Sequence, residues 1–177
     1  MAQIAVVLAK NDDTYRDYPA KFMKHFLSIA YAMINRNASE SMWDEQDGFF
    51  YDVLRKNDGS STRLKVRSMV GLIPLCAAQV FEQDAMEQFP ELGEVLQSLQ
   101  NKYPDRHNAF HDIRLKGYAN RHLMSALDEA NLRRVLKIML DPDEFLGDYG
   151  IRSISKRHER DPYRFVHNEQ EYVVQYL

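Results

Sequence analysis

The sequence of 177 residues predicts an all-α protein with one short β-hairpin. Two observations carry this prediction. Apolar residues recur at intervals of three and four over several long segments, which is typical of helices that bury one face. The segments between them are long, aromatic and charged, and their spacing is too irregular for a solenoid of repeats. We therefore expect about five substantial helices joined by elaborate loops.

The N-terminal part of the chain predicts two helices. Residues 2–10 are apolar and rich in alanine but have no capping residue before them, which is typical of the later part of a helix. After the turn that follows, Pro19 suits the first position of a second helix. This helix of roughly five turns is predicted by apolar residues at three-and-four spacing, namely Phe22, Phe26, Ile29, Ala30 and Met33.

The middle of the chain predicts a hairpin and then a kinked helix. Residues near 49–66 alternate between aromatic or β-branched runs and a turn that contains Asp58-Gly59, which is a hairpin signal. The apolar residues 68–81 predict a buried helix that Pro74 kinks, because proline removes a backbone hydrogen bond. The residues of this helix expected in the core are Val70, Leu72, Ile73 and Leu75.

The C-terminal half predicts two further helices and an extended end. Residues 89–103 form an amphipathic pattern, and residues 126–141 form another, with Ser125 or Asp128 as its cap. The inward residues of the latter helix are expected to be Leu132, Val135, Leu136 and Met139. Residues 108–125 and 141–155 are expected to be irregular, and residues 164–177 have extended character.

Composition excludes several classes of function. A net charge of −3 and a pI near 6.1 indicate neither nucleic acid nor an anionic membrane as a partner. No apolar run is long enough to span a bilayer, and the single Cys76 has no partner for an internal disulfide. We expect Cys76 to be buried in a protein of the reducing cytoplasm. His107 and His111 have metal-ligand spacing but no evident third ligand, so no metal site is predicted.

The strongest site signal is "MWDEQDGFFYDVL", residues 42–54, which mixes large aromatic side chains with carboxylates. Aromatic faces stack against sugar rings and carboxylates accept hydrogen bonds from hydroxyls, so the segment fits the floor of a carbohydrate pocket. It also fits an ordinary hairpin with one wet and one dry side, in which Trp43 and Phe50 are core and Asp44 caps the turn. The residues alone leave both interpretations open.

Four motifs occur in order over residues 42–177, namely "MWDEQDGFFYDVL", "LKVRSMVGLIPL", "FLGDYGIRSISKRHERDPYRF" and "EYVVQYL". Together they resemble the catalytic domain of glycoside hydrolase family 63-type glucosidases, in the branch of mannosyl-oligosaccharide-glucosidase-like proteins. The resemblance implies a portion of an (α/α)6 toroid whose loops build the site. It also implies an inverting reaction on α-glucosidic or related bonds without metal or cofactor, with acid and base carboxylates roughly 6.5–9.5 Å apart.

The resemblance places the catalytic aspartate before this chain and the catalytic glutamate after it. We therefore expect residues 1–177 to be a single partial domain, the middle of a toroid, with no catalytic residue of its own and little activity alone. It implies carbohydrate as the partner, and the substrate-binding residues that it implies are Trp43, Asp44, Asp47, Tyr51, Asp52, Arg67, Tyr149 and Arg152. Uncovered helix faces of such a fragment predict self-association.

Two other classes compete with the glycoside hydrolase hypothesis. One is a non-catalytic helical module that binds carbohydrate or a protein partner. The other is a different α/α toroid such as a cyclase, which would require a set of metal ligands that the sequence does not show. Whether the chain belongs to an enzyme is left open at this point.

Overall fold

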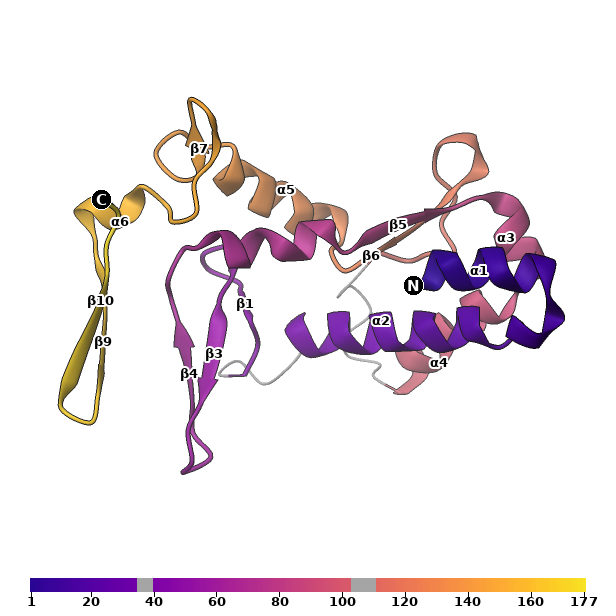
Figure 1. Cartoon of the computed structure of the whole chain (residues 1–177), viewed down its shortest axis with the longest axis horizontal. Coiled ribbons are helices and arrows are strands. Elements are labelled where there is room, and N and C mark those ends of the chain that lie inside the picture. The colour runs from indigo at the N-terminus through magenta and orange to yellow at the C-terminus, as the bar shows by residue number, and fades with distance from the viewer. Residues whose placement is uncertain (35–39, 103–110) are drawn as a thin grey trace. The chain divides into compact units, whose positions relative to one another are not determined.

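The computed structural model describes residues 1–34, 40–102 and 111–177 (Figure 1). Its helices are α1 (Ala2–Asn11), α2 (Tyr18–Ile34), α3 (Gln83–Gln88), α4 (Glu91–Lys102), α5 (Glu129–Met139) and α6 (Arg157–Arg160), with the 3-10 helices η1 (Asp13–Tyr15), η2 (Met69–Cys76) and η4 (Tyr118–Asn120). Its strands are β1 (Trp43–Asp44), β2 (Phe49–Phe50), β3 (Asp52–Arg55), β4 (Ser61–Leu64), β5 (Ala78–Phe81), β6 (His122–Ser125), β7 (Leu146–Gly147), β8 (Gly150–Ile151), β9 (Tyr163–His167) and β10 (Gln170–Val174). No helix in these ranges combines the length and the apolar character that a membrane span requires.

The predicted all-α class is wrong. The structure contains 45% helix and 23% strand, and its described strands form five antiparallel two-stranded sheets instead of one hairpin. A mixed α/β fold therefore replaces both the all-α class and the partial toroid. The additional strands escaped prediction for two reasons. Strands of two residues, such as β7 and β8, are too short to show a periodic pattern. Strand β5 pairs with β6, which is distant in the sequence, so no local turn signal indicates this pair.

The described residues divide into two compact units, whereas the sequence was interpreted as a single partial domain. One unit comprises Met1–Asn35 and Ala77–Asp128, and the other comprises Arg36–Cys76 and Glu129–Leu177. Along the sequence, the chain therefore runs through the first unit, the second unit, the first again and the second again. Each unit is built from two segments that are not adjacent in the sequence, so contacts distant in sequence hold both together.

In the first unit, α2 packs against both α1 and α4 (Figure 1). The predicted helix over α2 is confirmed, but the face that it buries is rotated from the predicted one. Met23 and Leu27 are buried, whereas Ile29 is exposed. The rotation follows from tertiary contacts, because a helix packed between two neighbours buries the residues that face both of them. The core of this unit also includes Phe89, Leu92 and Leu96.

The second unit has an aromatic core and several hairpins. The rings of Phe49 and Phe145 stack with centroids 5.6 Å apart, and both side chains are fully buried. The hairpin predicted near residues 49–66 is confirmed as β3–β4, in which Asp52 lies opposite Leu64. The extended character predicted for the C-terminal residues is confirmed as β9–β10, in which Phe165 lies opposite Tyr172.

The apolar residues 68–81 do not form the predicted kinked α-helix. They form the 3-10 helix η2 and then strand β5, and Pro74 lies within η2. A 3-10 helix has three residues per turn, so its buried and exposed sides differ from those of an α-helix. Val70 and Ile73 are consequently exposed while Leu72 is buried. Cys76, at the end of η2, is exposed and not buried as predicted.

η2 lies directly on the aromatic core of the second unit. A Cβ atom added at Gly71 would lie 2.4 Å from Phe49 Cε1 and 2.4 Å from the carbonyl oxygen of Phe50. No side chain is tolerated at such distances without movement of the neighbours. Gly71 therefore permits the close approach of η2 to the segment that carries the candidate site.

Candidate functional site

The segment Trp43–Tyr51 folds into a tight hairpin made by β1 and β2. Trp43 lies opposite Phe50, and Asp44 lies opposite Phe49. Between the strands, the Asp47 N–H donates to Asp44 Oδ1 at 2.9 Å, and Gly48 has a φ of +63°. This left-handed conformation favours glycine, so the turn depends on the residue type at position 48. The segment is a hairpin with a buried aromatic side, and two of its residues, Asp47 and Tyr51, line a cavity.

Trp43 is buried within this hairpin. Its ring packs against Phe50 with centroids 4.9 Å apart, and the guanidinium of Arg134 lies over the ring at 5.3 Å from its centroid. The indole Nε1–H donates to Glu45 Oε2 at 2.7 Å. Because both the face and the polar edge of the indole have protein partners, the structure places Trp43 as a core residue and does not present its face to a ligand.

Asp44 is a buried carboxylate with two cationic partners. Its Oδ2 lies 2.8 Å from Arg63 Nη1 and 2.9 Å from Lys65 Nζ. Burial alone would raise the pKa of Asp44, but the Asp47 N–H and the two cations together lower that pKa from 3.8 to about 2. A carboxyl group with this pKa remains ionised at neutral pH and does not donate a proton.

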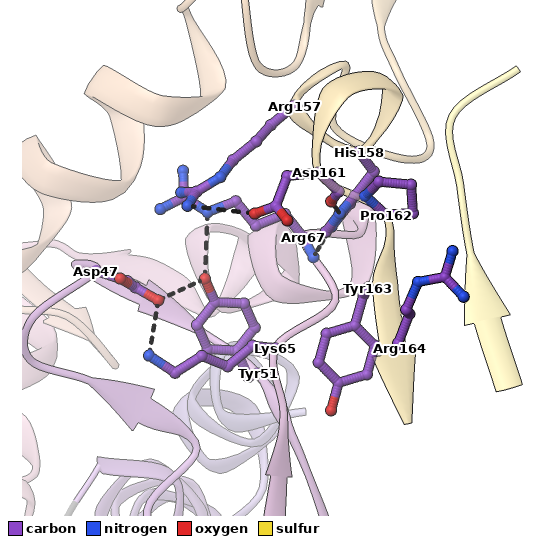
Figure 2. A pocket seen from close by; sticks show the side chains of 10 residues that line it. All are labelled: Asp47, Tyr51, Lys65, Arg67, Arg157, His158, Asp161, Pro162, Tyr163 and Arg164. Atoms are coloured by element: carbon purple, nitrogen blue, oxygen red, sulfur yellow. Dashed lines mark hydrogen bonds and ion pairs between the residues drawn. The ribbon is translucent and has the colours of Figure 1, made fainter. Parts of the chain in front are cut away.

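A row of hydrogen bonds runs from Asp47 through Tyr51 and Arg67 to Glu144, and Figure 2 shows the part from Asp47 to Arg67. The Tyr51 hydroxyl donates to Asp47 Oδ2 at 2.9 Å and accepts from Arg67 Nε at 3.2 Å. Arg67 then forms an ion pair with Glu144, and the Ser155 hydroxyl donates to the other oxygen of Glu144. Burial raises the pKa of the Tyr51 phenol, so this residue stays protonated and continues to donate to Asp47.

This row borders a cavity of about 310 Å³. The residues that line it are Asp47, Tyr51, Lys65, Arg67, Arg157, His158, Asp161, Pro162, Tyr163 and Arg164. Its wall therefore combines hydrogen-bond donors, carboxylate acceptors and the ring of Tyr163. Figure 2 shows Tyr163 and Arg164 on opposite sides of β9, with the ring of Tyr163 on the side of Tyr51 and Lys65.

His158 joins the two segments that make the cavity wall. Its Nε2 accepts from the backbone N–H of Arg67 at 2.9 Å, and its Nδ1 lies 2.9 Å from the carbonyl oxygen of Asp161. A ring nitrogen that accepts from an amide is unprotonated, and one that faces a carbonyl carries a hydrogen. The neutral tautomer with hydrogen on Nδ1 therefore satisfies both contacts. The Ser155 N–H also donates to the Arg67 carbonyl at 2.8 Å, which fixes the same junction.

The structure brings only some of the predicted site residues to the cavity. Asp47, Tyr51 and Arg67 line it, whereas Trp43 and Asp44 are buried and do not line it. The three remaining residues lie elsewhere: Asp52 is exposed on β3, Tyr149 is fully exposed between β7 and β8, and Arg152 donates to the carbonyls of Pro142 and Leu146. The contacts of Arg152 brace the loop before β7.

The sequence predicts Arg67 as a site residue but gives no role to the two cations before it. In the structure Arg63, Lys65 and Arg67 all contact acidic or phenolic side chains. A signal for this existed. These three cations alternate along an extended segment, and residues at i, i+2 and i+4 of a strand share one face. For Arg157, His158 and Tyr163, no local pattern indicated the site, because their partners are distant in sequence.

The described residues offer no metal centre, since no three His, Cys, Asp or Glu side chains among them are placed to hold an ion. His107, one of the two histidines with metal-ligand spacing, lies outside the described residues, and His111 lies within them. The candidate site thus consists of hydrogen-bonding groups around a small cavity.

Comparison with known proteins gives one informative relationship and no family assignment. No protein-family model matches the chain, and no solved structure matches it. The chain is 35% identical over 192 residues to uncharacterized protein YMR196W of Saccharomyces cerevisiae. The match covers 100% of this chain but 17% of the yeast protein, so the chain spans about a sixth of the length of this curated relative.

Proposed function

We propose that this chain is the sugar-binding part of a glycoside hydrolase that acts on α-glucosidic or related bonds by an inverting mechanism. The observation that carries the proposal is the hydrogen-bonded row of Asp47, Tyr51 and Arg67 at the edge of the cavity. The resemblance of four ordered motifs to family 63-type glucosidases supplies the reaction class. The activity and substrates of any longer protein that contains this chain are part of the proposal.

The chemistry of the cavity wall suits a neutral sugar. Each sugar hydroxyl both donates and accepts a hydrogen bond, so its binding site requires carboxylates and cationic donors side by side. Asp47 supplies an acceptor, because Tyr51 and Lys65 occupy its Oδ2 and among the described residues no partner is recorded for Oδ1. Lys65 and Arg67 supply donors, and the ring of Tyr163 supplies a flat face for the C–H groups of a sugar.

We assign binding and not acid–base catalysis to these residues. An inverting glycosidase requires one protonated carboxyl group and one carboxylate on opposite sides of the bond. Asp44 stays ionised because its pKa is about 2, and Glu144 is held by Arg67 and Ser155. We therefore propose that the acid and the base belong to parts of a longer protein outside this chain.

The second candidate function is a non-catalytic carbohydrate-binding or interaction module. The pairing of Asp44, Asp47 and Glu144 with cations favours it, because each of these carboxylates is engaged in an ion pair within the chain. The two candidates share the sugar site and differ in whether the longer protein hydrolyses a glycoside. An assay of that longer protein against α-glucosides separates them.

Calorimetric titration of the purified chain with methyl α-glucoside tests the shared proposal. We expect binding that weakens about tenfold or more in Asp47→Asn, since a charge-assisted hydrogen bond to a hydroxyl is lost. Asp52→Asn is the matched control, because Asp52 is an exposed aspartate close in sequence and outside the cavity. Absence of binding by the unmodified chain, or equal binding by both variants, would refute the sugar site.

Hydrolysis is tested separately with α-glucosides and α-mannosides. We expect no turnover at an enzymatic rate from residues 1–177, because the resemblance places both catalytic carboxylates outside this chain and an acid–base pair contributes typically 10²–10⁴-fold. Turnover that disappears in Asp44→Asn would overturn this assignment and make Asp44 the acid. Turnover that appears only in the longer protein is the expected result.

Two further proposals concern partners and location. Ile4, Val7 and Leu8 are exposed apolar residues on α1, and we propose that this face mediates self-association, with concentration-dependent sedimentation as the test. A strictly monomeric chain at high concentration would contradict it. We also propose that the protein works in the cytoplasm, since its single cysteine suits a reducing compartment. Fractionation of cells that express a tagged full-length protein tests this location.

A further inference from the structure

The hairpin β9–β10 carries a row of rings on one face. Because side chains alternate along a strand, Tyr163, Phe165 and His167 share one face of β9. Tyr172 lies opposite Phe165 on the neighbouring strand, with ring centroids 6.4 Å apart. The rings of Phe165 and His167 stack at 6.1 Å with an interplanar angle of 13°. The row therefore extends along β9, with Tyr172 of β10 as its most exposed aromatic side chain on the neighbouring strand.

This row begins at the cavity. Tyr163 is both the first residue of β9 and part of the cavity wall, and Figure 2 shows its ring on the cavity side of the strand. Residues that share its face, including Phe165, therefore continue the same surface away from the cavity. The other face differs in character, because Arg164 and Glu171 form an ion pair there at 3.0 Å.

The size of the cavity limits what it encloses. Its volume of about 310 Å³ is at the lower end of the range of about 300–1,000 Å³ for small-molecule pockets. A chain of several sugar units cannot fit inside and has to leave through the open side. The row of rings on β9–β10 offers such a chain an aromatic surface at that side, and aromatic rings are suited to the C–H groups of sugar rings.

The rings also contribute to the hairpin itself, since cross-strand aromatic pairs stabilise a two-stranded sheet. That role accounts for contact between Phe165 and Tyr172. It does not require the side chain of Tyr172 to remain 48% exposed or the row to start in the cavity wall. A ligand that leaves the cavity along this face accounts for both features.

We propose that the aromatic face of β9–β10 is a second binding subsite that selects oligosaccharides over single sugars. This inference rests on the proposed function, because it takes the cavity to hold the first sugar unit. The occupant is a linear chain of neutral sugars, since the exposed ring of Tyr172 offers a stacking surface on this face and the ionic pair lies on the opposite face.

Calorimetric titration of the purified chain with methyl α-glucoside, maltose and maltotetraose tests the subsite. For the unmodified chain we expect maltotetraose to bind about 10-fold more tightly than the monosaccharide, which is the gain expected from stacking on one or two rings. Tyr172→Ala is expected to remove about 3- to 10-fold of this gain and to leave binding of methyl α-glucoside unchanged.

The hairpin offers a matched control for this variant. Val173 is the next residue of β10, is 46% exposed against 48% for Tyr172, and lies on the opposite face. Val173→Ala is expected to keep the full preference for maltotetraose. Phe165→Leu retains an apolar cross-strand contact without a ring, so it separates stacking from hairpin stability and is expected to lose the preference.

The outcomes of this experiment separate the two proposals. The subsite would be overturned if the unmodified chain bound all three saccharides with equal affinity and Tyr172→Ala bound them as Val173→Ala does. The cavity would then be a site for one sugar. Failure of the unmodified chain to bind any of them would overturn the proposed function together with the subsite. A preference for maltotetraose that Tyr172→Ala and Phe165→Leu reduce, and Val173→Ala does not, supports the subsite.

Discussion

Replacement of Asp44 by asparagine is the most informative perturbation of the second unit. The carboxylate of Asp44 is buried, accepts from the Asp47 N–H and pairs with Arg63 and Lys65. Asparagine is nearly isosteric and retains an acceptor for the Asp47 N–H, so Asp44→Asn removes the charge with little change in packing. The two cations are left without their shared partner.

The structure gives the size of the expected loss. The pKa of Asp44 falls from 3.8 to about 2 on folding, and each unit corresponds to about 1.4 kcal/mol. We therefore expect Asp44→Asn to lower the free energy of unfolding by about 2–3 kcal/mol at pH 7. Asp52→Asn, which alters an exposed aspartate on β3, is expected to change it by about 0.5 kcal/mol or less.

The same reasoning fixes the sign of the pH dependence. A depressed folded-state pKa contributes stability that is fully present above the unfolded pKa and is lost as the pH falls through the folded pKa. With values of 3.8 and about 2, the contribution of Asp44 persists down to about pH 5 and falls to about half by pH 3. The difference between the unmodified chain and Asp44→Asn should shrink over this interval.

Urea unfolding followed by tryptophan fluorescence measures these quantities. Trp43 is the single tryptophan, is buried, and is adjacent to Asp44, so its emission reports on this unit. A loss in Asp44→Asn that equals that of Asp52→Asn, or that stays constant between pH 7 and pH 3, would refute the account of Asp44 as a buried, ion-paired carboxylate.

Two other variants test the packing and the hydrogen-bonded row. Gly71→Ala places a Cβ 2.4 Å from Phe49 Cε1 and should lower the free energy of unfolding by about 1–3 kcal/mol. Gly93→Ala is the control, because the nearest neighbour of its Cβ is Arg114 Cγ at 3.9 Å, and it should be neutral or slightly stabilising. Thermal unfolding followed by circular dichroism measures both. Equal melting temperatures for the two would contradict the close approach of η2. Arg67→Lys keeps the charge but replaces the planar fork that contacts Tyr51 and Glu144, so a loss of about 1–3 kcal/mol is expected by Trp43 fluorescence. The conservative change Arg55→Lys on β3 is its control, and an equal effect of both lysines would show that the fork is unimportant.

Local patterns in the sequence determined several elements of this protein. Three-and-four spacing predicted α2, α4 and α5, because a helix of three or more turns repeats its apolar residues often enough to be recognised. The hairpin β3–β4 was predictable for a different reason, since Asp58-Gly59 between two β-prone runs specifies a turn. The candidate site was predictable in part from the unusual mixture of rings and carboxylates at residues 42–54.

Other features depended on contacts between residues distant in sequence. The buried face of α2 is set by packing between α1 and α4, which is why Met23 is buried and Ile29 is not. Strand β5 exists because β6 pairs with it, and the 3-10 conformation of η2 accompanies its contact through Gly71 with the aromatic core. These interactions overrode the helical pattern of residues 68–81, as tertiary packing often overrides local propensity.

The composition of the site shows the same division. The residues 42–54 determined which carboxylates and rings would gather in one hairpin, but not which of them would face a ligand. Trp43 is buried under Arg134, which is far along the chain, and Asp44 is buried against Arg63 and Lys65 of the segment that includes the next hairpin. The cavity wall likewise required His158 and Tyr163, which are about 90 residues or more from Arg67 and Tyr51. Charges and rings that are neighbours only in space acquire their partners when the chain folds, and no local pattern records that choice.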